Sequence, residues 1–246
     1  MSPMKLLLSF VFVTAAYVVK GLAGFGDPLL YSPLLSLYLP NSTITPALAP
    51  VSLAMNAGIV WRSREHFSAK IVLPITVFVI LGTIPGTLLL RVGSPQVLKL
   101  VLGLVIIGLG IEMLLRKPGT LQKPHPVARA VISFCSGLTA GLFGINLLFL
   151  AYMERVTENR EEFRANSCFI FFLDNVFRLA MLIVTGMFTR DALLLCAVSL
   201  PAAFLGMRLG RLLDSTLSEK VSRRLIILVF ILGGVSISLY ALPQLL

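Results

Sequence analysis

Uncharged stretches about as long as a membrane is thick recur along the whole chain. A helical crossing needs about 20 apolar residues, and a Lys, Arg or Asp at its centre costs about 2.5 to 3.5 kcal/mol. Residues 44–61 fit, running from a proline-rich start to Trp61 at a membrane interface, and residues 165–187 fit although they contain Asp174 and Arg178. The clearest predicted spans are residues 71–90, 100–115, 192–207 and 225–242. This pattern predicts an all-α integral membrane protein.

Two further apolar regions, residues 6–40 and 130–153, are broken by glycine in the middle. The breaks read GLAGFG over residues 21–26 and GLTAGLFG over residues 137–144. Backbone groups freed by a break inside a membrane need protein or a water-filled cavity as partner. We therefore interpret each region as a helical hairpin whose break faces a cavity.

The composition agrees with a membrane protein and excludes most soluble functions. Hydrophobic residues make up 57% of the chain and charged residues 13%, against about 25% charged residues in soluble domains. The mean hydropathy is +0.93 and is spread along the chain, which excludes a soluble enzyme with a single anchor. The first 19 residues could be scored as a signal peptide, but the apolar sequence continues beyond them, which favours a retained first helix.

The positions of the basic residues favour a hairpin at 130–153. Lys and Arg outnumber Asp and Glu by 21 to 11, and the cations lie in short loops, as in cytoplasmic membrane loops rather than nucleic-acid-binding surfaces. If 130–153 turns back, the four loops with the most Lys and Arg all lie on one side of the membrane. These are 62–70 with three basic residues, 116–129 with four, 154–164 with three and 208–224 with five. A single crossing would divide these loops between the two sides. A hairpin at 6–40 places the 41–43 turn and both termini outside.

Matching features recur in the two halves at a nearly constant offset. Phe25-Gly26 and Phe143-Gly144 are 118 residues apart, Asn56 and Asn175 are 119 apart, and Gly86 and Gly206 are 120 apart. They predict two repeats, residues 1–116 and 127–246, joined by a short cytoplasmic loop. Each repeat consists of a glycine-broken helical hairpin plus three transmembrane helices. An odd number of segments makes the repeats inverted, an architecture common in secondary transporters that bind substrate at the midplane.

The short helices after the two breaks point to an anion site. They are expected to begin near Asp27-Pro28 and Asn146, with proline suited to a first helical turn. Their free amide groups and positive dipole ends attract anions. The alternative is that the glycines only allow close helix packing.

Charged and amide side chains within the spans are the other candidates, because such residues inside a membrane are costly and usually functional. Arg178 would attract the anion, although Asp174, four residues earlier, could pair with it instead. Lys20 could reach the site or extend to an interface, and Asp27 could cap the short helix or carry a proton. The amides could bind substrate or bond between helices. The substrate-binding candidates are Lys20, Gly24, Phe25, Gly26, Asp27, Asn56, Gly141, Gly144, Asn146, Asn175 and Arg178, and the proton-coupling candidates are Asp174 and Asp27.

No enzyme, metal or cofactor is predicted. Cys135, Cys168 and Cys196 are single residues in apolar segments, without CxxC or a nearby histidine pair, so neither a metal site nor a disulfide framework is indicated. Paired carboxylates, a His and Asp cluster or a Ser with a base are not visible within the spans. The expected partners are a small anion, the lipid bilayer and protons as a coupling ion, with no nucleic acid.

The stretches GLAGFGDPLLYSPLL and GLTAGLFGINLLFL resemble the TauE/SafE family, also called the sulfite exporter or TSUP family. The resemblance covers about residues 8 to 240. It implies export of a small anion, such as sulfite or an organosulfonate, across the plasma (inner) membrane. The sequence departs from the family pattern at Asp27 and at Ile145-Asn146, where consecutive glycines are expected.

These inferences predict a secondary transporter of a small organic or inorganic anion that works by alternating access. An anion channel and a non-transporting scaffold subunit remain as alternatives. A channel is an alternative because breaks at the midplane also form selectivity filters.

Overall fold

The computed structural model describes residues 1–92, 125–143, 146, 148–157 and 160–214, with isolated positions within 103–115 and 221–239. The predicted spans 100–115 and 225–242 fall largely outside these residues. All elements in the described part are helical, in agreement with the predicted all-α class. The helices are α1 Pro3–Ala23, α2 Asp27–Ser36, α3 Asn41–Arg62, the 3-10 turn η1 Arg64–His66, α4 Ala69–Val92, α6 Pro126–Phe143, α7 Leu148–Val156, α8 Arg160–Val184 and α9 Arg190–Asp214.

Five of the described helices, α1, α3, α4, α8 and α9, are long and apolar enough to cross a membrane. The predicted spans 44–61, 71–90 and 192–207 lie inside α3, α4 and α9. The span predicted over 165–187 corresponds to α8, which starts five residues earlier and ends at Val184. At 1.5 Å per residue the 22 residues of α3 reach about 33 Å, enough for a bilayer core.

The first glycine-broken region is a hairpin with one long and one short arm. Gly24 ends α1 at φ 88° and Gly26 precedes α2 at φ 95°, a left-handed conformation that glycine adopts without a steric penalty. The chain then turns back, because Tyr38 after α2 meets the start of α1. Its hydroxyl lies 3.0 Å from Ser9 Oγ, and its carbonyl accepts from Lys5 Nζ at 3.3 Å.

The second region has the same form. The 18-residue α6 is followed by the nine-residue α7, and the two helices pack on one another. The backbone amide of Phe149 in α7 donates to Ser136 Oγ in α6 at 3.4 Å. Gly144 and Ile145, which lie in the predicted break, are outside the described residues.

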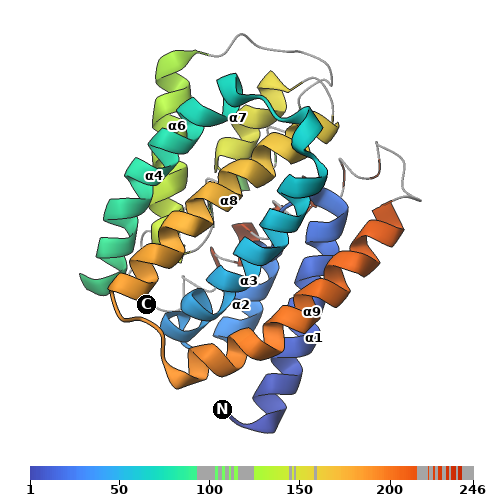
Figure 1. The fold of residues 1–246 in the computed structure, drawn as a ribbon, viewed down its shortest axis with the longest axis vertical. Coiled ribbons are helices and arrows are strands. Elements are labelled where there is room, and N and C mark those ends of the chain that lie inside the picture. Colours follow the sequence, from blue (N-terminus) through green and yellow to red (C-terminus); the bar gives the residue numbers. More distant parts are fainter. Residues whose placement is uncertain are drawn as a thin grey trace.

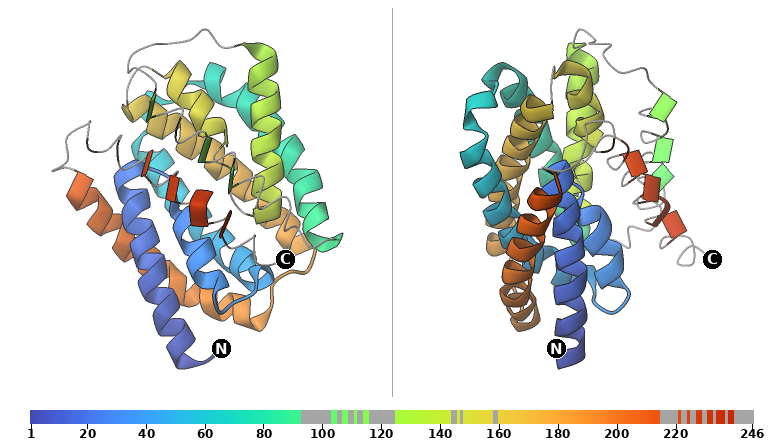
Figure 2. Two further views of the ribbon diagram at one scale, coloured as in Figure 1. Left: turned by 180° about the vertical axis from the view of Figure 1, so that it is seen from behind. Right: turned by 90° about the vertical axis from the view of Figure 1, so that its right-hand side faces the viewer.

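The long helices pack in pairs on either side of a central pair. α1 lies along α9, α4 lies along α6, and α3 and α8 cross between them (Figures 1 and 2). Both outer pairs are close enough to exclude side chains. A Cβ on Gly21 would lie 2.8 Å from the Cα of Gly210, and one on Gly137 would collide with the carbonyl oxygen of Val79. The packing alternative from the sequence therefore holds for Gly21 and Gly137.

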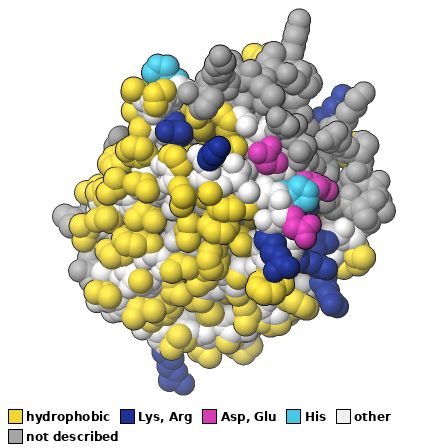
Figure 3. Space-filling model, turned by 45° about the horizontal axis from the view of Figure 1, so that its top comes forward, with side chains coloured by type: hydrophobic (Ala, Val, Ile, Leu, Met, Phe, Trp, Pro, Cys, Tyr) yellow, Lys and Arg dark blue, Asp and Glu magenta, His cyan; other side chains and the backbone are white. Residues whose placement is uncertain are grey.

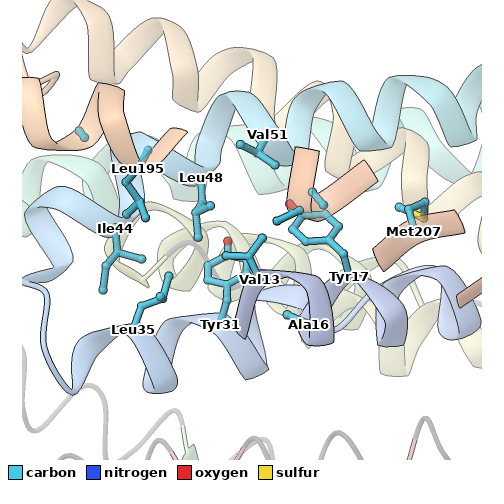
Figure 4. Packing of buried hydrophobic residues seen from close by; sticks show 14 of the residues in the cluster. Val13, Ala16, Tyr17, Tyr31, Leu35, Ile44, Leu48, Val51, Leu195 and Met207 are labelled. Carbon is cyan, nitrogen blue, oxygen red and sulfur yellow. The ribbon is translucent and has the colours of Figure 1, made fainter. Parts of the chain in front are cut away.

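Hydrophobic side chains fill the interior and also cover the outside. Tyr17, Tyr31 and Leu48 belong to a buried cluster formed by α1, α2, α3 and α9 (Figure 4). On the outside, Leu73, Val77 and Leu81 of α4 are 48 to 55% exposed. Their spacing of four residues makes one apolar helix face, which suits contact with lipid.

The basic residues after α3 and those at the start of α8 lie at the same end of the bundle. His66 Nε2 after α3 lies 3.0 Å from Glu161 Oε2 at the start of α8, and the Ser68 amide donates to Asn166 Oδ1 at 2.8 Å. Charged side chains gather at this end, above a hydrophobic flank (Figure 3). The N-terminal amine is at the other end, 3.1 Å from Asp191 at the start of α9. Two of the four loops grouped by the positive-inside count, 62–70 and 154–164, are thus at one end, whereas the loops 116–129 and 208–224 lie largely outside the described residues.

Candidate functional site

A pocket lies where the starts of the two short helices approach the middle of α3 and α8. The pocket is small in this conformation: its cavity volume is about 20 Å³, roughly the room that one water molecule needs. It is lined by Lys20, Gly26, Asp27, Pro28, Ser52, Asn56, Asn146, Phe171, Asn175 and Arg178. Seven of the eleven predicted substrate-binding residues thus come together, from five separate segments of the chain.

On one side of the pocket, Lys20 and Asp27 form a buried ion pair. Lys20 Nζ lies 2.8 Å from Asp27 Oδ1, and each side chain is 3% exposed. Ser52 Oγ donates to Asp27 Oδ2 at 3.3 Å and lies 3.0 Å from the Tyr17 hydroxyl. The Lys20 ammonium also lies 5.7 Å from the centre of the Phe171 ring, a cation–π distance.

This ion pair answers two questions that the sequence left open, one about Lys20 and one about Asp27. Lys20 does not extend to an interface, because its partner Asp27 holds it inside the bundle. Asp27 does not cap α2, since the N-cap residue is Gly26 and no side chain caps that helix. The turn through Gly24 and Gly26 is what brings Asp27 back to Lys20, seven residues earlier in the chain.

Asp174 lies beside the pocket and is held by neutral donors. Thr83 Oγ1 of α4 lies 2.7 Å from its Oδ1, and Asn146 Nδ2 donates to its Oδ2 at 2.9 Å. Asp174 is 1% exposed. Asn146 precedes α7 just as Asp27 begins α2, so in both hairpins the residue at the start of the short helix bonds to a central helix.

Arg178 is buried without an acidic partner. The side chain is 3% exposed, and its Nη1 and Nη2 donate to the Ala140 carbonyl at 3.3 Å and to Asn175 Oδ1 at 3.0 Å. Its Nε has no hydrogen-bond partner. Among the described residues no carboxylate lies within the 4.0 Å of an ion pair. The Asp174–Arg178 pair considered from the sequence is therefore absent, because Arg178 reaches α6 whereas Asp174 faces Thr83 and Asn146.

The two central amides have different surroundings. Asn175 accepts from Arg178 on its own helix, and Asn56 is 1% exposed with no partner for its Oδ1. A buried polar atom without a partner costs about 1 to 3 kcal/mol. The pocket lining thus contains an unpaired acceptor and, on Arg178, an unpaired donor.

Four predicted residues are not among those lining the pocket. Gly24 forms the turn after α1 and packs on Arg164, whose guanidinium donates to the Gly21 and Leu22 carbonyls at 2.7 and 2.9 Å. Phe25 is buried in a hydrophobic cluster. A Cβ on Gly141 would lie 2.5 Å from the Thr83 carbonyl oxygen. Gly144 is outside the described residues.

Four residues of the site were not among the predicted binding residues: Pro28, Ser52, Phe171 and Thr83. Ser52 is four residues before Asn56 and Phe171 is four residues before Asn175, so helical spacing from the chosen amides would have found both. Thr83 gave no signal, because threonine is common in membrane helices and its contact with Asp174 joins residues 91 positions apart.

Comparison with known proteins gives one match. The family model for the sulfite exporter TauE/SafE matches residues 8–237 of the 246-residue chain. No curated protein and no solved structure matches significantly. TauE/SafE is a family of transporters, which is consistent with a multi-pass membrane protein that moves a small anion and is not an enzyme. The chain belongs to the sulfite exporter TauE/SafE family.

Proposed function

We propose that this protein is a secondary transporter that binds a small anion in the pocket and moves it across the membrane by alternating access. The observation that carries the proposal is Arg178, a guanidinium that is 3% exposed and lines the pocket without a carboxylate partner among the described residues. A buried, unpaired charge is costly, and an anion in the pocket removes that cost.

The other pocket groups also suit an anion. The N-terminus of α2 has no side-chain cap and reaches the pocket through Gly26 and Asp27, so its positive dipole end adds to the attraction. Lys20 supplies a second cation, which is paired with Asp27. Asn56 and Asn175 supply amide groups at lower desolvation cost than full charges.

The alternating movement uses the two predicted inverted repeats, residues 1–116 and 127–246. The pairing of α1 with α9 and of α4 with α6 supports this, because exchanging equivalent helices of the halves exchanges these two pairs. Asp27 and Asn146, 119 residues apart, make the equivalent contacts to α3 and α8. Rocking of one part of the bundle against the other would open the pocket to each side in turn.

Sulfite or an organosulfonate is the proposed substrate, and export across the plasma (inner) membrane is the proposed direction. Family membership supports a sulfite-type anion, and the small pocket favours a compact one. By the positive-inside rule, the basic residues around Arg64 and Arg164 support a cytoplasmic location for that end and an N-terminus outside. Protons are the proposed coupling ion, with Asp174 or Asp27 as carrier.

Transport assays in proteoliposomes test the proposal. Vesicles containing the full chain should take up labelled sulfite or sulfoacetate when the outside is more acidic than the inside, whereas Arg178→Gln vesicles should show no flux at equal amounts of folded protein. Arg190→Gln, at an exposed position near the opposite end, is the matched control. If flux survives in Arg178→Gln, Arg178 is not required for binding the anion.

The same vesicles separate the carrier from a channel. A carrier turns over slowly and saturates with substrate, whereas a channel gives a measurable conductance without saturation in that range. If no anion gives either saturable uptake or a conductance, the alternative of a non-transporting scaffold subunit is favoured.

A further inference from the structure

The two buried aspartates of the site differ in how their charge is compensated. Asp27 has the Lys20 ammonium at 2.8 Å and the Ser52 hydroxyl at 3.3 Å. Among the side chains that the structure describes, Asp174 has Thr83 and Asn146, both neutral, within hydrogen-bond distance. No cation among the described residues lies within 4.0 Å of it. Inside the membrane, a negative charge on Asp174 is therefore much more costly than a negative charge on Asp27.

The surroundings of Thr83 add a hydrogen-bond constraint. Three oxygen atoms lie within reach of its Oγ1: the Val79 carbonyl at 2.9 Å, the Gly137 carbonyl at 3.3 Å and Asp174 Oδ1 at 2.7 Å. The two carbonyls accept only, and a threonine hydroxyl has a single hydrogen. If Asp174 is ionised, that hydrogen is contested by three acceptors. A proton on Asp174 Oδ1 reduces this competition, because the carboxyl then donates to Thr83 Oγ1 and the Thr83 hydrogen is left for the two carbonyls, of which Val79 is the nearer.

We propose that Asp174 is the proton-binding residue of this protein, and that it holds a proton in the conformation seen here, donated to Thr83 Oγ1. An ionised carboxylate without a cation in a membrane interior costs several kcal/mol, whereas a neutral acid with satisfied hydrogen bonds does not. The 2.7 Å distance between Thr83 Oγ1 and Asp174 Oδ1 is typical of an O–H donor to an oxygen.

Few other titratable groups face Asp174. Helices α3 and α4, which pack on α8, have none between Asn41 and Trp61 or between Ile71 and Leu90. On α8 itself Arg178 is one turn away, and Lys20 with Asp27 lies across the pocket. Besides Asp27, the buried titratable groups that the structure describes on α2 and α7 are Tyr31 and Tyr152.

The consequence, which rests on the proposed function, is proton–anion coupling. With Asp174 neutral, Lys20, Asp27 and Arg178 leave the site with one net positive charge, whereas with Asp174 ionised the net charge is zero. Anion binding therefore favours the protonated form, and release of the anion favours release of the proton. One proton then moves with each bound anion in the same direction. Asp27 is excluded from this role, since protonating it would break its pair with Lys20.

Infrared spectroscopy of the full chain in lipid tests the protonation without any substrate. With the aspartate carboxyl carbons labelled with ¹³C, the protein at neutral pH should show the carbonyl band of a protonated carboxylic acid, moved by the label. A carboxyl group that is ionised gives no such band, so the band reports protonated aspartates alone. The band should be absent in Asp174→Asn and present in Asp27→Asn.

Thr83→Val provides a second test of the protonation of Asp174 in case Asp174→Asn does not fold. It removes the hydroxyl that accepts the proton but leaves the acid, so the band should remain and change frequency. A wild-type protein without a label-sensitive band, or a band lost in Asp27→Asn and kept in Asp174→Asn, would overturn the proposal. Either result would leave anion transport itself standing, because the measurement involves no anion.

Discussion

Lys20 Nζ and Asp27 Oδ1 lie 2.8 Å apart although a two-glycine turn separates the helices that carry them. Both side chains are 3% exposed, so the pair is shielded from solvent on all sides. It joins the long and the short arm of the first hairpin at the pocket. Removing either partner leaves the other charge buried and alone.

We therefore expect the single variants Lys20→Met and Asp27→Asn to be less stable than the combined variant. Loss of one member of a buried pair costs about 3 to 5 kcal/mol, whereas replacing both with neutral groups is often close to neutral. Chemical unfolding in detergent micelles measures this difference. Costs of the two single changes that simply add in the double variant would contradict a direct pairing.

The turn that makes this pairing possible should depend on glycine at position 26. Its φ of 95° is strained for any residue with a Cβ, so Gly26→Ala should lower the unfolding free energy by about 1 to 2 kcal/mol. Gly58→Ala is the matched control, because no heavy atom lies within 4 Å of its added Cβ. That change, inside α3, should stabilise by up to about 1 kcal/mol. Equal effects of the two changes on thermal unfolding would show that position 26 does not need the left-handed conformation.

The two ends of the bundle should react from opposite sides of the membrane. Glu65 and Arg190 are both exposed, Glu65 beside the basic end and Arg190 at the end that holds the N-terminus. In a background without native cysteines, Arg190→Cys should react with an impermeant thiol reagent added outside intact cells, and Glu65→Cys only after permeabilisation. Labelling of both from one face would contradict the fold, and a reversed result would contradict the cytoplasmic placement of the basic loops.

The spans and the hairpin turn followed from sequence because each has a local cause. Uncharged runs of membrane length predicted α3 and α4 within three residues at each end, but ended seven residues before the end of α9. The glycines at 24 and 26 marked the turn, where both adopt positive φ. The charged and amide residues inside the spans were chosen because their burial is costly, and Arg178, Asn56 and Asn175 do line one pocket.

The hydrogen-bond and packing partners of each residue were less predictable, because they depend on contacts between distant segments. Helical spacing suggested that Asp174 pairs with Arg178, but the side chains diverge to Thr83 and to Ala140 on different helices. The glycines at 137 and 141 looked like part of a break and instead serve the packing of α6 on α4. No periodicity within one segment reports which face a neighbouring helix covers.

The central claim is that a small anion binds beside Arg178, and calorimetric titration of the purified full chain tests it most directly. The panel is sulfite, sulfoacetate, taurine, acetate, pyruvate and chloride, each titrated into the wild type, Arg178→Gln and the control Arg190→Gln. We expect selective binding of one anion class in the wild type and the control. In Arg178→Gln the affinity should fall by at least about 30-fold, the equivalent of about 2 kcal/mol. Equal affinity in Arg178→Gln, or no binding of any anion to the wild type, would contradict the account.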